Sequence, residues 1–247
     1  MTSEGRADAR AVFVGSGPPP VAVRGTRAMA SSLESLADFE LEGRLAAGSG
    51  EATNDLRELV RRNLREAADA SRRFAELGSD GSAQLYPKTE LGARLALVAQ
   101  LLRARFGATV LYTSQQGYDT HSKQADDHGR LLGELASALT VFLDDLTSAG
   151  RASDVVVLIF SEFGRTVAEN GSFGTDHGSA GPVFLAGAAV RGGLVGTPPS
   201  LTDLVDGHLA IQHDLRRVYA ALLEDWFGIG NAPILGAAFE RLPLLAT

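Results

Sequence analysis

The sequence predicts an α/β fold with a mostly parallel central sheet flanked by helices. Amphipathic segments of helical length alternate with short apolar runs of strand length, which is the order typical of such folds. The run at residues 154–160 is continuously apolar and rich in valine, as in strands that are covered on both faces. The chain shows no internal repeat and no clear boundary of a second domain, so we expect residues 1–247 to form a single α/β domain.

The first half of the chain predicts two strands and two helices. The stretch 11–23, AVFVGSGPPPVAV, indicates a strand that stops at three prolines. Residues 53–78 have the pattern of a charged amphipathic helix that ends at a glycine. A second helix is expected over 88–107, with an apolar stripe of Leu91, Leu95, Val98 and Leu102. The apolar run 108–113 then predicts a buried strand.

The second half predicts a long helix, two strands and a last helix. Residues 124–150 have one apolar helical face, formed by Leu131, Leu135, Ala138, Leu139, Phe142 and Leu146. The run 154–160 is expected to be a central strand, and 182–187 is a shorter one. Residues 214–228 indicate a helix that starts near an aspartate and ends at a glycine.

Composition excludes several classes of protein. The net charge of −7 argues against nucleic acid as a partner, because phosphate binding needs a basic face. No apolar run reaches the ~20 residues that a membrane span needs. The first residues lack the pattern of a signal peptide, so the chain as written is expected to be cytoplasmic. The chain has no cysteine, so any metal must bind histidine, carboxylate or backbone oxygen.

Acidic residues and histidines follow two of the predicted strands. The stretch GYDTHSKQADDH at 117–128 comes after the strand 108–113, and SEFGR at 161–165 comes after the strand 154–160. Ligand sites of α/β sheets gather at the carboxyl ends of strands, so these stretches should face one crevice. The glycine-flanked stretch GTDHG at 174–178 adds two more polar residues. The candidate metal ligands are Asp119, His121, Glu162, Asp176 and His177.

This set of nitrogen and oxygen donors is typical of a site for Zn, Mn or a similar divalent cation. The alternative is that these residues only shape loops, where aspartate commonly bonds the local backbone. Arg165 has two interpretations as well, since it could bind an anionic substrate or pair with Glu162 or Glu169.

The remaining histidines are weaker candidates. His128 could be a fourth ligand, a partner of a ligand, or a polar helix residue. His208 and His213 fall in a polar segment before the last helix, where surface or capping roles are expected.

Several blocks together resemble a bacterial family called domain of unknown function 1501. They are LYPKTELGARLALVAQLL, GYDTHSKQ, FSEFGRTVAENGSFGTDHGSAGPVFLAG, VRGGLVGTPPSLTDL and DLRRVYAALLEDWFG. Their order and spacing match across roughly residues 82–230, and more loosely from about residue 10. That family is similar to the alkaline phosphatase and sulfatase superfamily, which hydrolyses phosphate or sulfate esters with bound divalent metals. The resemblance therefore implies an alkaline-phosphatase-like fold and a metal-dependent hydrolase of small anionic esters.

The resemblance also implies roles for particular residues. Asp119 and His121 match the Asp and His that the superfamily places after one strand, although their spacing is tighter here. Glu162 and Phe163 stand where the superfamily has Asp and His, and His177 fits the position of a further His.

The main departure from the superfamily is on the N-terminal side. There the superfamily carries a nucleophile and another metal-binding Asp, often behind a twin-arginine export signal, and nothing here matches them. We therefore expect a C-terminal part of a larger domain, with an incomplete sheet prone to self-association. Four hydroxyl residues lie near the candidate ligands, but nothing in their sequence spacing marks any of them as the nucleophile. They are Ser122, Ser161, Thr120 and Thr175. The alternative function is thus an inactive remnant or a binding module of the same fold.

Two geometric expectations follow. Asp119, Glu162 and His177 should converge in one crevice. The strand 182–187 should run antiparallel to 154–160, because His177 precedes its strand whereas Glu162 follows its own.

Overall fold

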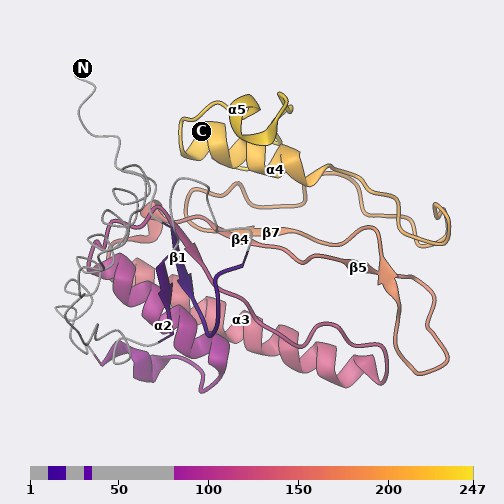
Figure 1. Ribbon diagram of the computed structural model, residues 1–247, viewed down its shortest axis with the longest axis horizontal. Helices are drawn as coiled ribbons and strands as arrows, with labels where there is room; N and C mark the ends of the chain where they lie inside the picture. The colour runs from indigo at the N-terminus through magenta and orange to yellow at the C-terminus, as the bar shows by residue number, and fades with distance from the viewer. Residues whose placement is uncertain (1–10, 21–30, 35–80, 247) are drawn as a thin grey trace, which may run out of the picture. The chain divides into compact units, whose positions relative to one another are not determined.

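The computed structural model describes residues 11–20, 31–34 and 81–246 (Figure 1). By its internal contacts the chain divides into two compact units. Unit 1 comprises residues 1–116 and 133–149, and unit 2 comprises residues 117–132 and 150–247. The helix predicted at 53–78 lies outside the described residues. In the ranges that are described, no helix is long and apolar enough to cross a membrane.

A three-stranded parallel sheet lies in unit 1. Its strands are β1 (Ala11–Val14), β2 (Ser31–Leu33) and β3 (Val110–Tyr112), in the order β2-β1-β3. Both neighbours of β1 run parallel to it, with Phe13 opposite Tyr112. The central strand β1 is the buried one, and the Thr113 hydroxyl adds a 2.8 Å hydrogen bond to the carbonyl of Val14. The predicted strand at 108–113 is confirmed as β3.

The expected burial of that strand is wrong. Val110 is 40% exposed, and the other two residues of β3 are only partly buried. Within the described residues β3 pairs with β1 alone, so it is an edge strand, and edge strands are covered less completely.

Helix α2 (Glu90–Arg103) begins where the Thr89 side chain accepts a hydrogen bond from the Gly92 N–H. Three residues of the predicted stripe, Leu91, Leu95 and Val98, are buried, whereas Leu102 is only partly buried. Ala99 and Leu101 are almost completely covered as well. The helix ends four residues before Gly107, because Arg105 adopts a left-handed φ of 52°. The N–H groups of Arg105 and Phe106 donate to the carbonyls of Leu102 and Leu101, which closes the last turn.

The long helix is confirmed as α3 (Gln124–Ser148), whose beginning belongs to unit 2 and whose remainder belongs to unit 1. Four residues of its predicted apolar face are buried, namely Leu131, Ala138, Phe142 and Leu146. In unit 1 the carboxylate of Asp145 accepts a hydrogen bond from the Tyr86 hydroxyl at 2.8 Å and pairs with Arg103.

Unit 2 is built on two small antiparallel ladders. One pairs β4 (Val157–Ile159) with β7 (Phe184–Ala186), and the other pairs β5 (Gly164–Arg165) with β6 (His177–Gly178). The antiparallel arrangement predicted for the strands at 154–160 and 182–187 is therefore confirmed.

The prediction of a central strand at 154–160 is wrong. In the described part of the chain, β4 pairs only with β7, and its residues are half-buried. Residues 152–154 form a short 3-10 turn (η3, Ala152–Asp154), which shortens the strand. The apolar run is instead explained by packing of Leu158 and Leu185 against a small core, formed by Val218, Ala221, Leu242 and Leu244.

That core includes the last predicted helix. Helix α4 (Leu215–Ala221) continues as a π-helical turn, η4 (Leu222–Trp226), and α5 (Ala232–Leu235) follows. The carboxylate of Asp214 accepts a hydrogen bond from the Arg216 N–H at 2.9 Å, so it caps α4 as expected. The described chain as a whole is thus a mixed α/β structure with small sheets and a few helices.

Candidate metal centre

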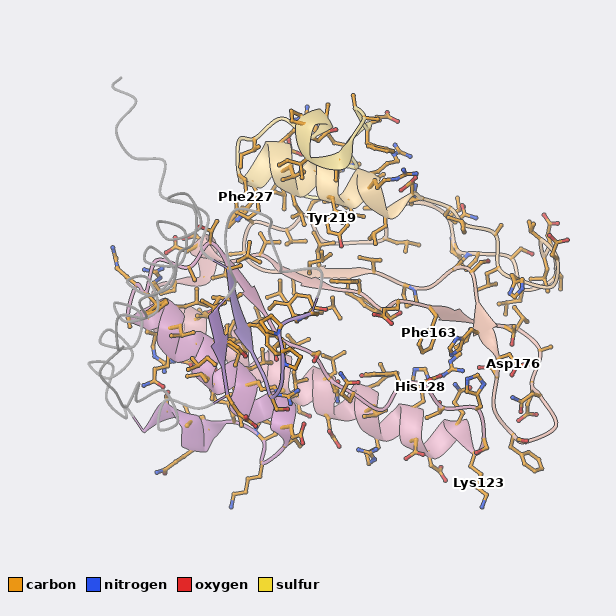
Figure 2. All side chains as sticks on the ribbon, in the orientation of Figure 1. Lys123, His128, Phe163, Asp176, Tyr219 and Phe227 are labelled. Atoms are coloured by element: carbon orange, nitrogen blue, oxygen red, sulfur yellow. The ribbon has the colours of Figure 1, made fainter. Side chains whose placement is uncertain are left out.

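Two segments of unit 2 carry the candidate ligands. One is the stretch 117–123 that leads into α3, and the other is the hairpin formed by β5, β6 and the loop 166–176 between them. The N–H groups of Lys123 and Gln124 donate to the carbonyls of Ser172 and Phe173, each at 3.0 Å. The loop of the hairpin therefore lies against the start of α3, where Figure 2 shows Lys123 and Asp176 at the same end of the unit.

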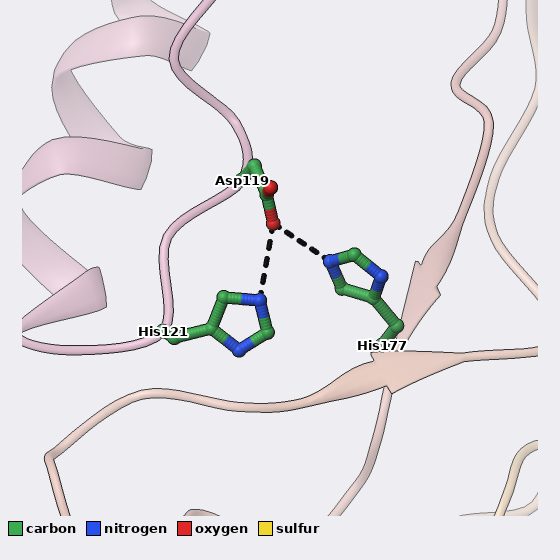
Figure 3. A group of neighbouring side chains, drawn as sticks. All are labelled: Asp119, His121 and His177. Atoms are coloured by element: carbon green, nitrogen blue, oxygen red, sulfur yellow. Dashed lines mark hydrogen bonds and ion pairs between the residues drawn. The ribbon is translucent and has the colours of Figure 1, made fainter.

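A tight cluster of one carboxylate and two imidazoles forms between these segments (Figure 3). Oδ1 of Asp119 lies 2.7 Å from Nε2 of His177 and 3.1 Å from Nε2 of His121. All three potential ligand atoms lie within 4.8 Å of one another. The side chains are 66%, 45% and 49% exposed for Asp119, His177 and His121, so a cation or substrate can reach them from solvent.

Asp176 lies beside this cluster, on the far side of one imidazole. Its Oδ1 is 3.4 Å from Nδ1 of His121, whereas Nε2 of the same ring faces Asp119. Asn170 holds the arrangement, because its amide donates to Asp176 Oδ1 at 3.3 Å and to the His121 carbonyl at 3.1 Å. A carboxylate on the second nitrogen of a metal-binding histidine is a common arrangement in metalloproteins.

Hydrogen bonds lower the pKa of both aspartates, Asp119 and Asp176. The hydrogen bond from His177 holds the pKa of Asp119 below its ordinary value, and His121 adds to this effect. The pKa of Asp176 is also lowered, first by the hydrogen bond from Asn170 and then by that from His121. Both carboxylates therefore remain ionised at neutral pH and present negative charge to a cation.

Glu162 does not take part in the cluster. Among the described residues, the group that could hold a metal contains Asp119, His121 and His177. The expected convergence thus holds for Asp119 and His177, and His121 takes the third place. The next residue after Glu162, Phe163, faces the cluster instead. Its ring stacks on the imidazole of His177 at 3.8 Å between centroids and 10° between planes.

Arg165 lies opposite His177 in the β5–β6 ladder. Its guanidinium donates to two backbone carbonyls, that of Thr175 at 2.6 Å and that of Tyr118 at 2.5 Å. It also lies 5.0 Å from the centroid of the Phe163 ring. These bonds go to the backbone of the two ligand-bearing segments, which neither interpretation of the sequence anticipated.

The other predicted candidates lie outside the cluster. The ring of His128 packs edge-on against Tyr118, with 5.9 Å between centroids. His208 bonds with the backbone of Val205 in a local bridge. His213 packs closely on Gly196, where an added Cβ would meet its Nε2 at 2.5 Å.

Three of the four candidate hydroxyls take part in local hydrogen bonds. Ser161 donates to the Phe163 carbonyl, Thr175 donates to Gln124, and Thr120 accepts from Gln124. These contacts tie the hydroxyls into the loops, and none of them joins a hydroxyl to an imidazole that could act as its base.

Sequence reasoning missed Asn170, whose carbonyl oxygen also accepts from the N–H groups of Ser172 and Gly174. The signal that could have found it is the Asn-Gly pair in a short polar loop, since asparagine side chains often bond the backbone of their own turn. Gly174, the first glycine of the glycine-flanked stretch, allows a close approach of two backbones, since an added Cβ there would lie 2.5 Å from backbone atoms of His121.

The donor set fits a divalent cation. Two imidazole nitrogens and one carboxylate oxygen suit Zn, and the mixture of nitrogen and oxygen also suits Mn. Three protein ligands leave coordination positions open, which is the arrangement of catalytic rather than structural sites.

A comparison with known proteins bears on the identity of the chain. Neither the curated proteins nor the solved structures include a match to it. A family model described as "Protein of unknown function (DUF1501)" matches residues 7–224. This match covers most of the chain, so the protein belongs to the DUF1501 family.

Proposed function

We propose that the protein is a metal-dependent hydrolase of phosphate or sulfate esters. In this proposal Asp119, His121 and His177 hold a divalent cation, with Zn or Mn as the best candidates. The observation that carries it is the convergence of two imidazole Nε2 atoms on one carboxylate oxygen, at 2.7 and 3.1 Å. The class of substrate is supplied by the resemblance of the DUF1501 family to the alkaline phosphatase and sulfatase superfamily.

The residues of the chain have separable tasks in this proposal. Asp119 supplies a charged oxygen ligand, and its lowered pKa keeps it ionised. Once Nε2 of His121 binds the cation, its Nδ1 can donate to the carboxylate of Asp176, which lies 3.4 Å away and would orient the ring. A bound divalent cation would supply Lewis-acid stabilisation of the negative charge that develops on the ester oxygens.

A second candidate is a binding module of the same fold that holds a cation without catalysis. The observation that favours it is the engagement of Ser161, Thr175 and Thr120 in local hydrogen bonds. Without an activated hydroxyl, a covalent route has no nucleophile, and hydrolysis would depend on water. We therefore expect slow turnover of esters by this chain.

The first test is cation binding by the whole chain. Calorimetry with Zn or Mn on chelator-treated protein should show binding, and Asp119→Ala should weaken it on the order of 100-fold, more than loss of a ligand's partner does. The matched control is Asp203→Asn, because Asp203 is an exposed acid of the same unit that has no part in the cluster. Equal affinity in all three proteins would refute the metal site.

The second test separates the two candidates. The metal-loaded chain is assayed with aryl phosphate and aryl sulfate esters, with Asp119→Ala as the blank. Turnover that Asp119→Ala abolishes and Asp203→Asn preserves supports the hydrolase. Cation binding with turnover equal to that of Asp119→Ala supports the binding module.

A further inference from the structure

The two ligand-bearing segments of the cluster are far apart in the sequence, and a single side chain joins their backbones. Asp119 and His177 are separated by 57 intervening positions, yet one carbonyl from each segment accepts from the same guanidinium. The accepting residues are Tyr118, directly before Asp119, and Thr175, two positions before His177. The orientation of the ligands therefore depends on where the Arg165 side chain lies.

The Arg165 guanidinium is well suited to hold the carbonyls of Tyr118 and Thr175 together, and this arrangement is called the clamp below. Hydrogen bonds from a charged donor are stronger than neutral ones, and these two measure 2.5 and 2.6 Å. The planar fork of arginine can span two acceptors at fixed spacing, which a lysine ammonium does less well. Both contacts are partly buried, so water competes with them less than at an open surface.

An aromatic ring links the clamp to one ligand. The Phe163 ring contacts the Arg165 guanidinium on one side at 5.0 Å and stacks on His177 at 3.8 Å. Arg165 and His177 are also direct partners in the β5–β6 ladder. The ladder thus constrains the backbone of His177, and the Phe163 ring, which also contacts Arg165, constrains the plane of its imidazole.

We infer that Arg165 is a positioning residue, which holds the side chains of Asp119 and His177 in the geometry that binds the cation. The inference rests on the proposed metal site and deepens it. It assigns to the guanidinium a task other than the contact with substrate anion that the sequence suggested.

The test compares three variants of the full chain. Arg165→Gln removes the charge and one arm of the fork, and Arg165→Lys keeps the charge without the fork. The control is Arg216→Gln, which removes an arginine of the same unit whose partner is Asp214 at the start of α4. Calorimetry gives the affinity for Zn or Mn, and a nitrogen-15 correlation spectrum of the metal-free protein reports the imidazoles of His121 and His177.

We expect Arg165→Gln to weaken cation affinity about 10- to 100-fold, the range seen when a ligand's supporting residue is lost. Arg165→Lys should fall between this variant and the wild type, and Arg216→Gln should match the wild type. The imidazole signals of the metal-free protein should shift in Arg165→Gln and stay in place in the control.

The remaining outcomes have distinct meanings. Unchanged cation affinity and unchanged imidazole signals in Arg165→Gln overturn the positioning role. Unchanged cation affinity with weakened binding of inorganic phosphate to the metal-loaded protein also overturns it, in favour of an anion contact. If the wild type binds no cation but the imidazole signals still shift in Arg165→Gln, the metal site fails while the positioning of the side chains is supported. Should Arg165→Gln fail to fold, Arg165→Lys carries the same comparison.

Discussion

Two carboxylates of this protein, one in each unit, show how similar contacts can serve different ends. In unit 1 the side chain of Asp145 is 9% exposed and bonds with the Tyr86 hydroxyl and the Arg103 guanidinium. In unit 2 the side chain of Asp119 is 66% exposed and bonds with two imidazoles. Each carboxylate therefore has two partners, but only one of them lies open to solvent.

The partners decide what each carboxylate can do. A guanidinium has no lone pair to offer, and burial together with the nearby Asp145 raises the pKa of Tyr86, so its hydroxyl stays protonated. The Arg103 guanidinium can only donate hydrogen bonds, and the Tyr86 hydroxyl uses its proton to donate to Asp145. A neutral imidazole carries a free electron pair, so the partners of Asp119 can turn from donors into metal ligands. The buried carboxylate of Asp145 can therefore only stabilise the fold, whereas the exposed carboxylate of Asp119 and its imidazoles have the donor atoms to bind a cation.

The largest expected effect concerns pH, which should act on the exposed group alone. Both imidazoles must be neutral to bind a cation, so protons compete with the cation for two nitrogens. The lowered pKa of Asp119 keeps its carboxylate ionised to below its ordinary range, so acidification to pH 5.5 leaves it charged. Cation affinity should therefore fall as the pH falls, with two protons in competition.

The measurement is calorimetry with Zn or Mn at pH 7.5, 6.5 and 5.5. His177→Ala serves as the comparison, because only one competing imidazole remains and the slope should halve. The result that contradicts this account is an affinity that does not vary across the range, which would mean that imidazoles are not the ligands.

Much of the fold could be predicted from local pattern. The long helix needs only its apolar face, and the buried Ala138, Phe142 and Leu146 lie where the periodicity places them. The antiparallel pairing of β4 with β7 followed from the order of His177 and its strand. The end of α2 could not be predicted, because Arg105 adopts a left-handed φ and closes the helix before Gly107, the residue at which the sequence indicates the end.

The site was harder to predict, for a physical reason. Residue type indicated five candidate ligands, since few side chains bind divalent cations, and three of them, Asp119, His121 and His177, form the cluster. Their supporting contacts depend on tertiary distances that spacing does not encode. Nothing local shows that Phe163 faces the cluster while Glu162 does not, or that Arg165 reaches the carbonyl of Tyr118.

The second prediction removes the buried carboxylate. Asp145→Ala removes the carboxylate that pairs with the Arg103 guanidinium in a mostly covered position, 19% exposed. Losing one partner of such a pair should lower the free energy of unfolding by about 3 kcal/mol. Urea denaturation measures the change, and cation affinity should remain within twofold of the wild type.

Asp119→Ala is the reciprocal experiment for this pair of carboxylates. It should abolish most cation affinity and leave the urea midpoint of the metal-free protein nearly unchanged, because the side chain is exposed. Asp119 precedes helix α3 by a few residues, and Asp145 lies within it. A parallel loss of stability and affinity in each variant would show that the helix couples the two groups, and the contrast drawn above would be wrong.

The smallest expected effect comes from adding one methyl group beside the exposed cluster. At Gly174 a Cβ would lie 2.5 Å from the backbone carbon and oxygen of His121, so one of the two segments must move. Overpacking of this kind typically costs about 1–3 kcal/mol, and the displacement should weaken cation binding roughly tenfold. Gly171 lies in the same loop and has no atom within 4 Å of an added Cβ, so Gly171→Ala is the matched control and should bind like the wild type. The geometry of the exposed cluster around Asp119 would then depend on the close approach of two backbones, whereas the buried group around Asp145 depends on packed side chains. If Gly174→Ala binds the cation as well as Gly171→Ala does, that approach is not what sets the ligand geometry.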